Sequence, residues 1–163
     1  MITGILALSG GEDTIEIGAI PGIETLADKT PPDLADQSGS TELDPKISGD
    51  LADGKCRSAA ARVRGLRMEY PDDQTLYVLE GGCYVCAGES KKALRSLAAL
   101  QEQLQPNAVP PAGFYWFEAQ AHLLAQDTSA ALKALEATQN SDPVYRDRAT
   151  LQTQEIMNMI NQQ

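Results

Sequence analysis

The sequence has little of three things that many functional classes require: positive charge, histidine and long apolar runs. Its 13 Lys and Arg residues stand against 23 Asp and Glu residues, for a formal net charge of −10 at pH 7. Nucleic acids and anionic membranes both attract Lys and Arg, so this balance argues against either as a partner. The apolar segment at the beginning of the sequence, residues 1–8, is far shorter than the roughly 20 residues that span a bilayer, so no membrane span is expected.

Motifs for catalysis and metal binding are also missing. A zinc site would have to combine His122, the only histidine, with Cys56, Cys83 and Cys86, and no second spaced ligand pair exists. No Ser or Cys has an evident base and orienting acid, no glycine-rich phosphate loop follows a strand, and no paired-carboxylate motif stands out. We therefore expect no enzymatic activity, no cofactor and no bound metal.

Most of the excess acid lies in the first fifty residues. They hold ten Asp and Glu against Lys29 and Lys46, so this third carries −8 of the total charge. Four prolines and several glycines interrupt any long helix there, although residues 14–17 alternate polar and apolar as a half-buried strand would. The prediction is an acidic, mostly irregular N-terminal arm over residues 1–50, either disordered or ordered by a partner.

The rest of the sequence, from about residue 51, is predicted to be helical. From about residue 51 the composition shifts to Ala, Leu, Gln and Arg, and apolar residues recur every three or four positions. Asp142 is expected to cap the last helix, with Pro143 at its first position. The helical domain is expected to cover residues 51–163, as a degenerate hairpin (51–71), two full hairpins (74–106 and 113–142) and a capping helix (143–162).

Three stretches of this domain repeat one another at spacings of 34 and 38 residues. The first set, Gly54, Ala59, Val63 and Leu66, recurs 34 residues later as Gly88, Ala93, Leu97 and Leu100. Ala93, Leu94 and Leu97 recur again, 38 residues later, as Ala131, Leu132 and Leu135. A single hairpin cannot bury its apolar stripe alone, so a period in the thirties with small residues at fixed offsets indicates stacked helical hairpins.

Two copies carry a longer pattern. They read Tyr77, Glu80, Gly81, Tyr84, Ala93, Leu97 and Pro106, and Tyr115, Glu118, Ala119, His122, Ala131, Leu135 and Pro143. Over residues 51–145 the chain thus resembles the tetratricopeptide repeat (TPR) family. The resemblance implies an all-α, TPR-like α-solenoid of antiparallel helical hairpins, in which the Gly and Ala residues fill the closest helix crossings. Glu80 and Glu118 replace the family's leucine, and each is expected to reach solvent or a basic neighbour.

In this family the first helix of each hairpin lines a concave groove that holds a peptide or another protein. The resemblance places the groove at Val78, Gly82, Val85, Cys86, Trp116, Gln120, Leu123 and Leu124. Trp116 is the strongest candidate, because Trp is prominent among interface hot spots and lies in the only aromatic cluster, residues 114–117. The alternative is that all four rings serve the core. The polar groove residues of the carboxylate-binding subfamily are absent, so an apolar or aromatic peptide is expected.

The family geometry also implies a disulfide. It brings Cys56 near Cys86 or Cys83, and such a bond would stabilise the fold by about 3 kcal/mol through the loop it closes. It would favour a periplasmic or cell-envelope location, whereas three reduced, buried thiols would suit the cytoplasm. The expected function is a scaffold that binds a partner polypeptide in the groove, with the arm adding contacts. The alternative is a structural subunit of a large cell-envelope complex, anchored mainly by the arm, with the groove unused.

Overall fold

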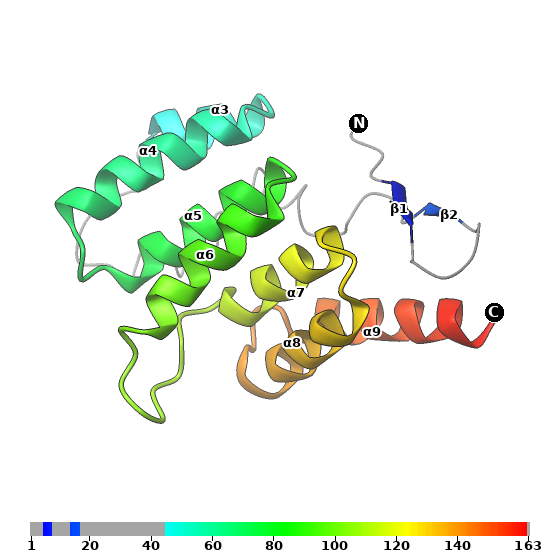
Figure 1. The fold of residues 1–163 in the computed structure, drawn as a ribbon. Coiled ribbons are helices and arrows are strands. Elements are labelled where there is room, and N and C mark those ends of the chain that lie inside the picture. The colour runs from blue at the N-terminus through cyan, green and yellow to red at the C-terminus, as the bar shows by residue number, and fades with distance from the viewer. Residues whose placement is uncertain (1–4, 8–13, 17–44, 163) are drawn as a thin grey trace.

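Residues 45–162 form an all-helical body in the computed structural model, which describes residues 5–7, 14–16 and 45–162 (Figure 1). Helices α5 and α6 lie within the range predicted for the second hairpin, and α7 and α8 within that of the third. The body consists of α3 (Pro45–Ala52), α4 (Cys56–Glu69), α5 (Gln74–Cys86), α6 (Ser90–Gln101), α7 (Phe114–Leu124), α8 (Thr128–Ser141) and α9 (Arg146–Asn161).

A short antiparallel pair of strands is described nearer the N-terminus. Strand β1 (Ile5–Ala7) pairs with β2 (Thr14–Glu16), and Leu6 lies opposite Ile15 at the centre of the register. Strand β2 falls where the alternating pattern predicted a strand. The rest of the predicted irregular arm, up to residue 44, lies outside the described residues.

Helix α3 shows that the predicted boundary at residue 50 is wrong. The helix starts at Pro45, a residue well suited to the first position of a helix. Ile47 and Leu51, four residues apart, are buried on the side that packs against α4. Asp50 accepts hydrogen bonds from Ser58 Oγ at 2.6 Å and Arg62 Nε at 2.8 Å, both on α4. The segment before Gly54 is therefore a short helix that completes the first hairpin.

The helices pack in the order of the chain. Helices α3 and α4, α5 and α6, and α7 and α8 form three hairpins. Adjacent hairpins contact each other through α4 and α5 and through α6 and α7, and α9 packs on α8 (Figure 1). Helix α5 also contacts α7. One continuous core therefore runs through the whole body, and α9 is the one described helix without a hairpin mate.

Small residues lie at the helix crossings, as the repeat predicted. Ala59, Ala93 and Ala131 have no exposed surface. A Cβ atom added at Gly81 would lie 3.0 Å from Leu97 of α6, so the glycine permits the close approach of the two helices in that hairpin. A larger side chain there would force the helices apart.

The start of the last helix differs from the prediction. Helix α9 begins at Arg146, and Pro143 lies in a preceding turn. The buried Asp142 carboxylate accepts hydrogen bonds from the backbone N–H groups of Val144, Tyr145 and Gly113, the last at 2.6 Å. These bonds hold residues 143–145 in a turn, so the predicted first helical position at Pro143 is wrong.

Candidate functional site

The predicted groove is not open to a ligand. Six of the predicted positions are buried, and Trp116, Val78, Val85 and Gln120 expose 1% of their surface or less. Cys86 and Leu124 are only partly exposed. The prediction that these positions bind a partner in a concave groove is therefore wrong for this chain. The buried positions are Val78, Gly82, Val85, Trp116, Gln120 and Leu123.

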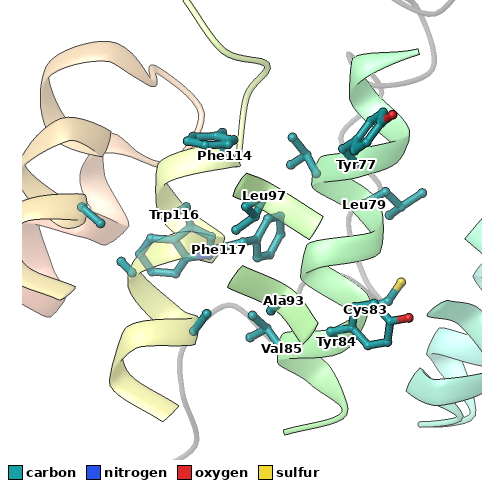
Figure 2. Packing of buried hydrophobic residues seen from close by; sticks show 14 of the residues in the cluster. Tyr77, Leu79, Cys83, Tyr84, Val85, Ala93, Leu97, Phe114, Trp116 and Phe117 are labelled. Carbon is teal, nitrogen blue, oxygen red and sulfur yellow. The ribbon is translucent and has the colours of Figure 1, made fainter. Parts of the chain in front are cut away.

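The physical reason is that each hairpin covers the one before it. Phe117 of α7 points toward α5 and Leu97 (Figure 2), and its ring would lie 3.1 Å from a Cβ atom at Gly82. In the same way, Tyr145, in the turn before α9, stacks on Trp116, and Gln152 of α9 is hydrogen-bonded to Gln120 of α7. The side chains that would line a groove are therefore used to join successive hairpins.

Trp116 belongs to an aromatic stack inside the protein. Its ring lies parallel to that of Tyr145, with centroids 5.6 Å apart and an interplanar angle of 11°. Phe117 meets the same Tyr145 ring edge-on at 5.9 Å. Burial, with Asp142 adding to it, raises the pKa of Tyr145 to about 12, so this phenol stays neutral. The aromatic cluster thus serves the core, which was the alternative interpretation, and only Tyr115 of residues 114–117 is partly exposed.

A buried pair of amides joins α7 to α9. Gln120 Nε2 donates to Gln152 Oε1 at 2.6 Å, and Gln152 Nε2 donates back to Gln120 Oε1 at 3.1 Å. Because each amide both donates and accepts, the pair satisfies two polar side chains away from water. Nε1 of the neighbouring Trp116 has no acceptor among the described residues. The amide pair fixes how α9 lies on α7.

Glu80 is buried and meets a basic neighbour, as predicted. Its Oε2 atom lies 2.6 Å from Nε of Arg67 on α4, although the N–H group is not aligned for a hydrogen bond. The guanidinium of Arg67 also lies 4.6 Å from the centroid of the Tyr77 ring. Glu118, the matching residue of the third hairpin, is half-buried, and burial raises the pKa of its carboxyl group, with His122 acting in the opposite direction.

The cysteines join α4 to α5. Cys56 and Cys86 form a disulfide with Cα atoms 5.7 Å apart, which is one of the two predicted pairings, and Cys83 is a buried free thiol. Burial, together with nearby Glu80, raises the pKa of Cys83 to about 12. This thiol is therefore protonated at neutral pH and is a poor nucleophile. The described residues contain no group of three or more His, Cys, Asp or Glu side chains placed to hold a metal ion.

Two surfaces of the body expose residues that the sequence did not single out. One is the outer row of α4, defined by Arg57, Ala61, Arg64 and Met68, all exposed and spaced three or four residues apart. Met68 exposes 78% of its surface. The other is the outward face of α9, which carries Leu151 and Met157. Both rows have helical periodicity, so the signal was present in the sequence, but the pattern alone does not tell an exposed row from a covered one.

None of the helices in residues 45–162 is long and apolar enough to cross a membrane. Comparison of the chain with known protein families, curated proteins and solved structures found no match. The fold is thus described by its own geometry, as an all-helical body of three consecutive hairpins and one further helix, and the family resemblance stays a prediction.

Proposed function

We propose that this protein is a non-enzymatic, TPR-like scaffold that binds a partner polypeptide. The observation that carries the proposal is the row of hairpins, each packed on the next through small residues at matching positions. Arrays of this kind hold long helical faces rigidly in place and use them to bind other chains. The side chains on such a face are positioned before the partner arrives, which lowers the entropic cost of binding.

Because the groove positions are buried, the proposal assigns the partner to the outer row of α4. Arg57, Arg64 and Met68 belong to residue types that are enriched at protein interfaces. Between them lies Ala61, and the adjacent exposed Gly65 is also small, so a partner backbone has room to approach closely. The row therefore suits a polypeptide segment that combines acidic and apolar side chains.

The charges around this row support an acidic partner. Arg57 is already paired with Glu89, at 2.6 Å, but its side chain still exposes 79% of its surface. Lys92 contacts the same Glu89 carboxylate, so the two cations share one anion at the end of the row. A carboxylate from a partner would meet a net positive surface there, which steers association and sets its orientation.

The second candidate function is a structural subunit of a cell-envelope complex, held mainly by the N-terminal arm. The disulfide between Cys56 and Cys86 favours this location, because disulfides persist in oxidising compartments such as the bacterial periplasm. The two proposals differ in which part of the chain makes the essential contact.

Charge reversal on α4 separates them. We expect Arg64→Glu and Met68→Glu each to weaken partner binding by about tenfold or more, or about 1.4 kcal/mol, with helicity unchanged because both positions are exposed. Lys133→Glu, an exposed charge reversal on α8, is the matched control and should bind normally. Affinity capture from the native source followed by titration with the identified partner provides the measurement.

Deletion of residues 1–44 completes the test, since this boundary leaves α3 intact. Partner binding that survives the deletion and is lost with Met68→Glu supports the scaffold. Binding that is lost with the deletion and survives both α4 variants supports the arm-anchored subunit. If neither change affects binding, both assignments of the contact surface are wrong.

A further inference from the structure

The outward face of α9 is an uncovered helix face. Helix α7 packs on α5, and Gln152 of α9 is hydrogen-bonded to Gln120 of α7, but no described helix packs on the far side of α9. Leu151 exposes 61% of its surface and Met157 exposes 44%. The buried residues of α9 (Ala149, Gln152 and Ile156) lie on the opposite side of the helix.

The chemistry of this face is unusual for so acidic a chain. Helix α9 (Arg146–Asn161) carries Arg146 and Arg148 against Asp147 and Glu155, so its net charge is zero, and the exposed Asp147 lies one turn before Leu151. The exposed row that we define as the α9 face consists of Leu151, Gln154, Met157, Asn158 and Asn161. Its polar members are amides, and every amide side chain can both donate and accept hydrogen bonds. An amide therefore finds a suitable partner in another copy of itself.

We propose that the α9 face binds a second copy of this chain, with the two α9 helices antiparallel across a two-fold axis. A two-fold interface requires a surface that complements itself, and apolar and amide side chains do so whereas a face of one charge sign does not. The chain as a whole carries −10, so two copies repel each other over most of their surface. Helix α9 has no net charge, so that repulsion is weaker there than over the rest of the acidic surface.

The geometry specifies which residues meet. Gln154 lies near the middle of α9 (Arg146–Asn161) and in the middle of the α9 face, with Leu151 and Met157 on either side. In an antiparallel pair centred there, Gln154 contacts Gln154 of the second copy. Leu151 of one copy then lies close to Met157 of the other, so the exposed apolar side chains bury each other.

The size of the surface sets the expected strength. A helix of 16 residues is about 24 Å long, and one such face buries less than the roughly 800 Å² per partner of a standard interface. Self-association is therefore expected at micromolar concentrations. It should strengthen as salt is added, because salt screens the repulsion between the two acidic chains while leaving an apolar and amide contact intact.

Sedimentation of the full chain tests the proposal. From about 10 to 200 µM, a concentration range suited to a contact of this size, we expect the mass to rise from 17.5 kDa toward twice that value. Leu151→Glu and Met157→Glu should each keep the protein monomeric, because each places a carboxylate against an apolar side chain of the second copy and removes it from water without a partner. Val109→Glu, at a loop residue that exposes 73% of its surface, is the matched control and should still dimerise.

A cross-link tests the register. Gln154→Cys should form an intermolecular disulfide on mild oxidation, whereas Glu136→Cys, exposed on α8, should not. The proposal is overturned if the protein stays monomeric throughout, if both charged α9 variants still dimerise, or if α9 captures a different protein without self-association. Arg64→Glu on α4 should leave the dimer intact, so this inference and the proposed partner site fail separately.

Discussion

The first hairpin and the C-terminal helices are attached to the rest of the helical body in different ways. At the N-terminal end, the buried residues of α4 are all of modest size, namely Cys56, Ala59, Ala60 and Val63, and the join to α5 is made by a disulfide and the buried pair of Arg67 with Glu80. At the C-terminal end, α7 buries large rings that pack against Tyr145.

This difference shows how one repeat pattern is stabilised by two means. A buried Phe or Trp ring removes about 150–250 Å² of surface from water, far more than an alanine does. The N-terminal hairpin, with little apolar area to bury, is instead tied by a covalent bond that restricts its unfolded chain. A buried ion pair adds specificity rather than much stability, because its desolvation offsets its attraction.

The largest effect is expected from breaking the C-terminal join. Trp116→Ala removes a fully buried ring and its stacking contact with Tyr145, so the free energy of unfolding should fall by about 3–5 kcal/mol. Chemical denaturation provides the value, and hydrogen exchange should show the loss of protection first in α7, α8 and α9. Tyr115→Ala, at the half-buried neighbour, should cost clearly less. A loss below about 1 kcal/mol for Trp116→Ala would contradict the stacked-core description.

A somewhat smaller effect is expected at the N-terminal join. Replacing both Cys56 and Cys86 by Ala opens a loop with a sequence separation of 30, and we expect a loss of about 3–4 kcal/mol. Exchange should then accelerate in α3 and α4 before the C-terminal helices. A reductant should destabilise the wild type and leave the double variant unchanged. Equal protection of α3 and α4 in both proteins would show that the disulfide does not hold the first hairpin.

The smallest effect is expected at Glu118, the half-buried repeat glutamate of the third hairpin, and it depends on pH. Burial raises the pKa of Glu118 above its ordinary value of 4.5, so the folded state holds the proton more tightly than the unfolded state does. Its contribution is therefore most favourable below the unfolded pKa and is lost as the pH rises through the folded value. Glu118→Gln should raise the melting temperature modestly at pH 7 and have little effect near pH 3. The opposite pH dependence would mean that Glu118 is stabilised as an anion.

Local signals in the sequence located most of the helices. Asp73 directly precedes α5 and is a residue type that favours this position, and its side chain accepts a hydrogen bond from the Thr75 N–H at 3.0 Å. Gly88, shortly after the end of α5, has a φ of +71°, a conformation that side chains disfavour and that often follows a helix. Such signals depend only on neighbours along the chain. Helix α3 was missed because the acidic, proline-containing context before it outweighed the spacing of Ile47 and Leu51.

The sequence by itself determined the helical hairpins, the small residues at their crossings and the acidity of the first fifty residues, because these follow from local preference and periodicity. Only the tertiary structure decided that Trp116 and its neighbours are covered and that the rows on α4 and α9 are exposed. An apolar row on a helix has the same spacing whether another helix or solvent faces it. The difference depends on where distant segments come to lie: Tyr145 and Gln152 meet α7, whereas no described helix packs on the outward face of α9.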